Sequence, residues 1–184
     1  SEVCEHERMR QELEKQLRFE RLLTDIATRF VAVSGDRLDA EIKTAQKQIC
    51  ECLGIDVCAL WQYSMRDPEL LRMTHIYAPA DFPAPAPSTL IARESFPWCL
   101  EKFKRNETII LSNVMNAPPE AEQDLKSWQY FGIRSSLVLP LFASGEGLFS
   151  ALGFAALKEE REWPAGLINR LQLVAQIFSG ALVR

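Results

Sequence analysis

The chain has 184 residues and a formal net charge of −4, with 47% hydrophobic and 25% charged residues. This balance is typical of one soluble globular domain, and the charge gives no reason to expect nucleic acid or an anionic membrane as a partner. No apolar run approaches the ~20 residues of a membrane span, and no signal peptide opens the sequence, which we expect to be a piece of a longer protein.

Cysteine and histidine are too few and too scattered to predict a metal site. The five cysteines follow no regular framework, which indicates reduced thiols and a cytoplasmic location: Cys4, Cys50, Cys52, Cys58 and Cys99. Cys50 and Cys52 lack the spacing of a CxxC motif. The only histidines are His6 and His75. We therefore expect no metal ion.

The first 33 residues predict one long helix, because they contain neither Gly nor Pro and are rich in strong helix formers. Its second half carries an apolar stripe that should face a core: Phe19, Leu23, Ile26, Phe30 and Val33. In residues 1–18 a thinner stripe of Met9, Leu13 and Leu17 lies among charges, which predicts a coiled-coil or linker helix that pairs with another helix. The alternative is a solvated helix with a frayed end.

Ser34–Asp36 breaks this helix, and Asp36 is expected to cap the next one, which Gly54 ends. That second helix has one apolar face, which should cover a sheet: Leu38, Ile42, Ala45, Ile49 and Leu53. Alternating residues predict strands over 55–63 and 70–77, joined at Arg66–Glu69 as a hairpin.

The remaining segments predict further strands joined by helices and loops. An irregular proline-rich loop precedes helices at 96–103, 118–132 and 163–184 and strands at 107–114, 135–142 and 148–157, the last two joined by "ASGEG". Hairpins connected by helices predict an α+β fold with a mostly antiparallel sheet.

The chain resembles a GAF domain of bacterial signalling proteins over about residues 19–184. The segments that carry the resemblance include "LGIDVCALWQY", "SFPWCLEKFKRNETIILSNV", "PPEAEQDLKSWQYFGIRSSLVLPLF" and "REWPAGLINRLQLVAQIFSGAL". The resemblance implies a GAF/PAS-like sheet of five to six strands flanked by helices, with long N- and C-terminal helices. It further implies that the terminal helices pair across a homodimer and connect to adjacent PAS and kinase domains in the same chain.

The resemblance also implies a small-molecule pocket between the sheet and the helices and loops on one face. The expected ligand-binding residues are Trp61, His75, Phe96, Trp98, Asp124, Trp128, Tyr130, Phe131, Arg134 and Ser135. Phe82 and Ser136 belong to the same neighbourhood. An aromatic wall with few polar groups is typical of such sites. The alternative is that these aromatic residues form a filled core.

The stretch "YFGIRSSLVLPLF" is interpreted as the turn from a cavity-lining helix into a central strand, with Gly132 ending the helix. Alternation assigns Ser135 to the same face as an aliphatic set, and Arg134, Ser136 and Val138 to the other. The aliphatic set is Ile133, Leu137, Leu139 and Leu141. Pro140 lacks an N–H, so it needs a bulge or a strand edge.

Three cofactor or enzyme alternatives follow from the resemblance. His75 could ligate haem, but a lone histidine in a strand is more often a hydrogen-bonded structural residue. Cys99 could carry a bilin, but Leu100 stands where bilin-binding relatives have His. Neither cofactor is therefore expected. Some GAF proteins reduce free methionine sulfoxide with clustered cysteines. On a helix Cys50 and Cys52 point about 200° apart, and Cys58 lies on the strand face opposite Trp61, so we predict a domain that is not an enzyme.

The last helix is apolar on more than one side, which indicates that it is shared between a core and a partner. The predicted dimer interface comprises Met9, Leu13, Leu17, Ile168, Leu173 and Ile177. The sequence therefore predicts a sensory and dimerisation module of a cytoplasmic two-component protein, most simply a sensor histidine kinase. A collapsed pocket that serves only dimerisation is the alternative within the same class.

Overall fold

Five strands form one sheet in the order β2-β1-β5-β4-β3, and every neighbouring pair is antiparallel. The computed structural model describes residues 1–63, 67–143 and 147–183. The strands are β1 (Val57–Tyr63), β2 (Leu71–Tyr77), β3 (Ile109–Leu111), β4 (Ser135–Ala143) and β5 (Gly147–Ala156). The α+β class and the five-stranded antiparallel sheet are confirmed. Arg66 and most of "ASGEG" lie outside the described residues.

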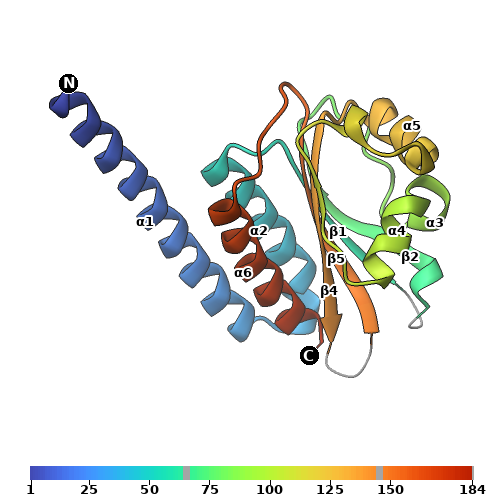
Figure 1. Cartoon of the computed structure of the whole chain (residues 1–184). Helices are drawn as coiled ribbons and strands as arrows, with labels where there is room; N and C mark the ends of the chain where they lie inside the picture. The colour runs from blue at the N-terminus through green and yellow to red at the C-terminus, as the bar shows by residue number, and fades with distance from the viewer. Residues whose placement is uncertain (64–66, 144–146, 184) are drawn as a thin grey trace.

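Helices cover both faces of the sheet (Figure 1). One face carries α1 (Glu2–Ala32), α2 (Leu38–Leu53) and α6 (Ala165–Leu182), and the other carries α3 (Ala92–Ser95), α4 (Pro97–Lys104) and α5 (Glu122–Phe131). The short α3 was not predicted, and β3 is shorter than the predicted strand at 107–114. No helix in the described part of the chain has the length and hydropathy needed to cross a membrane.

The helix-side core fills the space between the sheet and the three long helices. Its largest fully buried side chains come from all three helices and from the sheet: Phe19, Ile26, Phe30, Ile42, Ile49, Leu60, Leu137, Phe154 and Phe178. The rings of Phe30 and Phe178 lie 5.2 Å apart and join α1 to α6. Each such side chain stabilises the fold by about 1.5–3 kcal/mol when buried. The first and last helices therefore lie on the same face, in contact.

The N-terminal half of α1 projects away from the body of the molecule (Figure 1). Phe19 is the first buried residue of the helix, and Glu2–Arg18 is exposed except for the half-buried Gln16. This part is about 25 Å long at ~1.5 Å per residue. Its charged residues pair along the helix, as Arg10 does with Glu7 at 2.7 Å.

Glycines end two helices as the sequence predicts. Gly54 after α2 and Gly132 after α5 have φ values of 66° and 72°, in the left-handed region that glycine adopts without steric cost. The predicted cap at Asp36 is wrong. Arg37 occupies the N-cap of α2 without a side-chain bond, and the Asp36 carboxylate accepts a hydrogen bond from the Ser34 hydroxyl instead.

A bulge in β2 divides that strand between the two faces of the sheet. Leu60 pairs with His75 and Trp61 pairs with Met73, so Thr74 is one extra residue in β2. Because one inserted residue reverses the alternation of side chains, Met73 and His75 lie on opposite faces although they are two residues apart. This bulge decides which residues of β2 reach the cavity described below.

Pro140 lies in β4 beyond the stretch that pairs with β3, since β3 reaches only from Ser136 to Val138. One side of β4 is thus a sheet edge at Pro140, as the missing N–H requires. The register between β4 and β5 shifts one residue later, between Leu141 and Phe142. Both features agree with the prediction of an edge or bulge at this proline.

Candidate functional site

A partly open, mainly apolar cavity of about 80 Å³ lies between the sheet and the helices α3, α4 and α5. The proline-rich loop before α3 contributes to its wall. Its lining residues are Val57, Ala59, Trp61, Met73, Ile76, Phe82, Pro85, Leu90, Ala92, Phe96, Cys99, Phe103, Trp128, Phe131, Ile133, Ser136, Val138, Gly153, Phe154 and Ala155. An apolar pocket with few polar groups is the usual form of a small-molecule site.

Aromatic pairs build the wall of the cavity. Phe96 meets Trp61 edge to face at 5.8 Å and tilts against Trp128 at 6.0 Å. Phe82 from the loop stacks on Phe131 at 5.5 Å. These pairs join the sheet, α4, α5 and the loop, and each adds about 0.5–1.5 kcal/mol beyond the burial of its surface. The predicted residues Trp61, Phe96, Trp128 and Phe131 thus lie together around one space.

The floor of the cavity is formed by the central strands. Ala59, Val138 and Gly153 sit side by side across β1, β4 and β5, since Gly153 pairs with both of the others. Met73 and Ile76 come from β2, on either side of the bulge. Sequence reasoning did not name these five residues as ligand-binding. The alternation of β1 placed Ala59 with Trp61, but nothing in the sequence announced the bulge.

Asp124 is fully buried but does not line the cavity. Its carboxylate accepts hydrogen bonds from the backbone N–H groups of Trp98 and Cys99, both at 3.0 Å. These N–H groups belong to the first turn of α4, which has no side-chain cap of its own. Burial raises the pKa of the Asp124 carboxyl, while the two backbone hydrogen bonds lower it by less. Asp124 therefore joins α5 to the N-terminus of α4.

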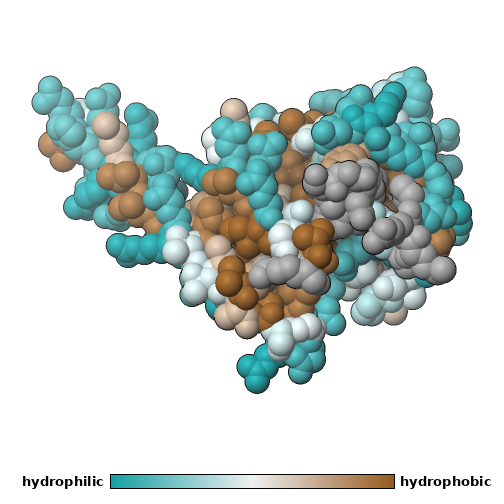
Figure 2. Space-filling model, turned by 90° about the horizontal axis from the view of Figure 1, so that it is seen from below, coloured by the Kyte–Doolittle hydropathy of each residue, from teal (hydrophilic) through white to brown (hydrophobic). Residues whose placement is uncertain are grey.

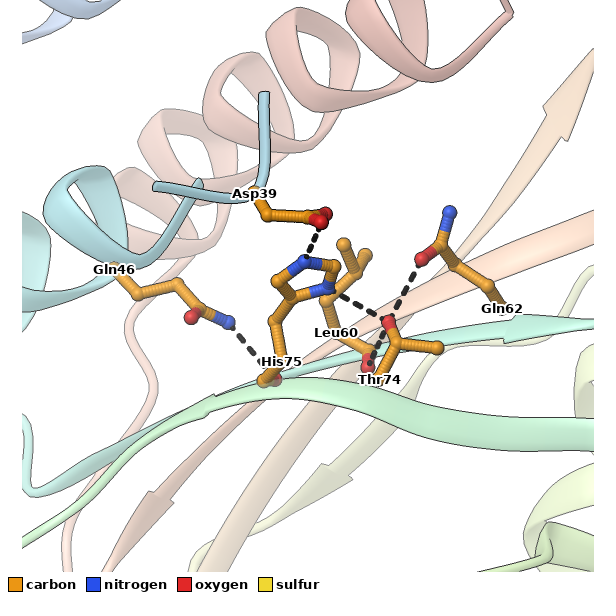
Figure 3. Close-up of polar contacts among 6 residues, drawn as sticks. All are labelled: Asp39, Gln46, Leu60, Gln62, Thr74 and His75. Atoms are coloured by element: carbon orange, nitrogen blue, oxygen red, sulfur yellow. Dashed lines mark hydrogen bonds and ion pairs between the residues drawn. The ribbon is translucent and has the colours of Figure 1, made fainter. Parts of the chain in front are cut away.

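His75 lies on the opposite face of the sheet from the cavity, because of the bulge at Thr74. Figure 3 shows its ring between Asp39 of α2 and the Thr74 side chain. Nε2 lies 2.8 Å from Asp39 Oδ1, Nδ1 lies 2.8 Å from Thr74 Oγ1, and the backbone carbonyl accepts a hydrogen bond from Gln46. The Thr74 hydroxyl also donates to Gln62 Oε1 at 2.7 Å. This network ties the edge strand β2 to α2.

The remaining predicted residues also lie outside the cavity lining. Trp98 packs edge to face on Trp128 at 6.5 Å with Lys102 over its ring, and Tyr130 and Arg134 are exposed. Ser135 faces the other side of β4, where its hydroxyl donates to the Ser112 carbonyl and accepts from the Arg161 N–H.

The alternation of side chains along β4 determines which serine hydroxyl reaches the cavity. Ser136 and Val138 line the cavity, whereas Leu137, Leu139 and Leu141 belong to the helix-side core. The predicted alternation is therefore correct for these residues. Ile133, which was assigned to the aliphatic face, precedes the strand and lines the cavity instead.

The cysteines do not gather at the cavity. Cys50 and Cys58 lie in the helix-side core, Cys99 lines the cavity on the other face, and Cys4 and Cys52 are exposed. Burial is the main cause that raises the pKa of both the Cys58 and the Cys99 thiols. Within the described ranges, no three His, Cys, Asp or Glu side chains form a group that could hold a metal ion.

A second recess, of about 390 Å³, lies between β4 and α6. It is more open and is lined partly by polar side chains, among them Asn106, Gln172 and Gln176. Small-molecule sites usually enclose most of the ligand surface. The smaller cavity, which is less open and has a more apolar lining, is for this reason the candidate site.

Comparisons with known proteins agree on the fold. The family model described as "GAF domain" matches residues 37–182. Among solved structures, a phycocyanobilin-bound GAF domain from a cyanobacterial phytochrome has a TM-score of 0.70 at 17% identity, with coverage of 89% of this chain and 93% of that one. The GAF domain of an Acinetobacter phosphoenolpyruvate-protein phosphotransferase has a TM-score of 0.68 at 13% identity, with 90% and 92% covered. No curated protein matches the chain.

Proposed function

The chain belongs to the GAF domain family, and from this premise we propose that it is a non-catalytic sensory and dimerisation module of a signal-transduction protein. Its cavity binds a small molecule, and its terminal helices pass the bound state to adjacent PAS and kinase domains, most simply in a cytoplasmic sensor histidine kinase. One observation carries the proposal: the sheet has an apolar cavity on one face and both terminal helices on the other.

The central strands connect the two faces. In β4, Val138 lines the cavity while Leu137 and Leu139 pack in the helix-side core with α6. Interiors are close-packed, so a strand that shifts to accommodate a ligand displaces the side chains on its other face. Shifts of about 1–2 Å at helix interfaces are an established switching mode. The ligand biases this change only through unequal affinity for the two states.

The projecting part of α1 provides the surface for a second copy of the chain. Met9, Leu13 and Leu17 are 65%, 55% and 43% exposed and follow one face of the helix at four-residue intervals. Figure 2 shows this apolar surface on the projecting helix, between hydrophilic side chains. On α6, Leu173 is 47% exposed, whereas Ile168 and Ile177 are partly buried against the helix-side core. Such a stripe favours pairing with a like helix in a symmetric dimer.

The two alternative functions, a methionine sulfoxide reductase and a dimerisation module with a collapsed pocket, require different features at the cavity. A methionine sulfoxide reductase needs reactive cysteines at the pocket, but only Cys99 of the described cysteines lines it, and burial holds its thiol protonated. A module with a collapsed pocket would have no cavity, so the space of about 80 Å³ favours ligand binding.

Native mass spectrometry of the purified chain tests both parts of the proposal, because it reports the dimer and any co-purifying molecule together. We expect a dimer that Leu13→Asp dissociates and that Gln11→Asp leaves intact. Gln11 is the matched control, since it is exposed on the same helix and lies about 160° around it from Leu13. A chain that stays monomeric with its complete α1 would contradict the dimer proposal.

A further inference from the structure

We infer that the cavity takes a neutral, mainly apolar molecule no larger than one aromatic ring, which lies over Gly153 and directs one polar atom at the Ser136 hydroxyl. This inference rests on the proposed function and narrows its ligand class. Three features carry it: the size of the cavity, the chemistry of its lining and the glycine in its floor.

The volume sets the upper limit on the ligand. The cavity of about 80 Å³ is roughly half as large as the ~150 Å³ engineered cavity that holds benzene. A single small ring fits with a modest displacement of the loop residue Phe82, which is only partly buried. A bilin, with four pyrrole-derived rings, does not fit. The cavity therefore differs in its ligand from the bilin-bound GAF domains that share the fold.

The lining excludes ionised groups. Every one of its residues is uncharged, and an unpaired charge in such surroundings is strongly disfavoured. Asp124 is fully buried and bonds to the backbone of the lining residue Cys99, so its carboxylate is already committed to the N-terminus of α4. It carries the wrong sign for a carboxylate or phosphate. Ligands with propionate or phosphate groups are thus rejected by charge as well as by size.

Ser136 supplies the polar contact. Its side chain is buried, it lines the cavity, and its hydroxyl has no hydrogen bond to any other residue that the structure describes. The other polar groups of the lining are the indole N–H groups of Trp61 and Trp128 and the Cys99 thiol. A hydroxyl both donates and accepts, so Ser136 accommodates a ligand hydroxyl or carbonyl equally.

The backbone conformation at Gly153 does not require glycine. Its φ lies outside the left-handed region, and an added Cβ would meet Val138 Cγ2 at 3.5 Å and the Ala59 carbonyl oxygen at 3.8 Å, both ordinary contact distances. Glycine in a strand interior weakens the strand and often marks a place that a ligand approaches closely. Alanine at this position would occupy the floor of the cavity without straining the sheet.

The test is isothermal titration calorimetry of the full chain with phenol, benzene and biliverdin. We expect both rings to bind, phenol about threefold to tenfold more tightly because of one hydrogen bond, and biliverdin not to bind. Gly153→Ala should weaken both rings by about tenfold or more, as one methylene does in an apolar pocket. Ser136→Ala should remove only the preference for phenol.

Gly166→Ala is the matched control, since Gly166 lies in α6 with open space around it. Thermal unfolding confirms that each variant is folded, and Ala59→Val fills the same floor should Gly153→Ala fail to fold. Tight binding of biliverdin, no binding of either ring, or unchanged affinities in the floor variant would overturn the inference. If neither ring binds while the dimer forms and a different molecule co-purifies, this inference fails and the proposed function stands.

Discussion

Asp124 shows how a buried carboxylate can serve the fold rather than the ligand. The resemblance placed it among the polar residues expected at the pocket. In the structure it is fully buried, and it binds the free N–H groups of Trp98 and Cys99. A negative charge at a helix N-terminus is favourable, and Pro97 in the first turn has no N–H to satisfy. Its role is to orient α4, which begins directly after Phe96 and carries Cys99 to the cavity.

The raised pKa of Asp124 predicts how stability depends on pH. Because burial raises the pKa of this carboxyl in the folded state, the folded chain holds the proton more tightly than the unfolded chain, whose value is about 3.9. Stability from this group is therefore complete below the unfolded pKa and is lost as pH rises through the folded pKa. As pH rises from the unfolded pKa to the folded pKa, the free energy of unfolding of the native chain should therefore decrease relative to that of Asp124→Asn.

Urea titrations of both chains at pH values from about 3.5 to 7 measure this difference in unfolding free energy. This pH range begins near the ordinary carboxyl pKa and extends above it. Asp124→Asn keeps the size of the side chain and removes its titration. A relative stability that rises with pH would show that the two backbone hydrogen bonds outweigh burial, and would contradict the prediction.

The cysteines give a second prediction at the scale of single residues. Cys4 and Cys52 are exposed, whereas Cys50, Cys58 and Cys99 are buried, and burial raises the pKa of the Cys58 and Cys99 thiols. Since the thiolate is the reactive form, iodoacetamide should modify only Cys4 and Cys52 in the folded chain. Peptide mass spectrometry identifies the sites, with a urea-unfolded sample as the control. Rapid modification of Cys99 would instead support a reactive pocket thiol.

At the scale of elements, the bulge in β2 has the largest effect on the site. Uninterrupted alternation would put Met73 and His75 on one face, and it is the inserted Thr74 that sends His75 to α2 and Ile76 to the cavity. A bulge is set by how a strand pairs with its neighbours. His75 was expected at the ligand because of its side-chain chemistry, and the paired sheet places it in contact with Asp39 instead.

Helix ends give a prediction with a control of opposite sign. Gly132 ends α5 with φ of 72°, and a side chain in the left-handed region costs about 1–2 kcal/mol, so Gly132→Ala should lower the free energy of unfolding by about that amount. Gly166 lies in the first turn of α6 without a positive φ, so Gly166→Ala should raise it, by less than the ~0.5–1 kcal/mol expected in a helix interior. Urea unfolding measures both. Equal effects of the two changes would mean that the turn after α5 does not require glycine.

At the scale of the whole molecule, α1 divides into a free half and a packed half. Phe19, Ile26 and Phe30 are its buried residues, and residues 2–18 lack any. A chain of residues 19–184 should therefore unfold at the same temperature as the monomeric Leu13→Asp variant and should not dimerise. Calorimetry and light scattering measure these properties. A large loss of stability in the shortened chain would show that the first 18 residues belong to the folded domain.

The sequence by itself determined the order of the strands and of the helices other than the short α3, the antiparallel sheet, the glycine helix ends and the face of β4 that Leu137 and Leu139 occupy. These follow from local periodicity and backbone preference, which neighbouring residues specify. Through a resemblance to the GAF family, it also predicted that Trp61, Phe96, Trp128 and Phe131 lie around one pocket.

Only the tertiary structure decided which polar groups reach that space. The Asp124 carboxylate bonds to the N-terminus of α4, and His75 bonds to Asp39 of α2. Ser135 points away from the cavity, whereas Ser136 lines it. A buried polar group takes whichever hydrogen-bond partner packing brings within reach. That choice depends on contacts between residues distant in the chain, on which the local pattern carries no information.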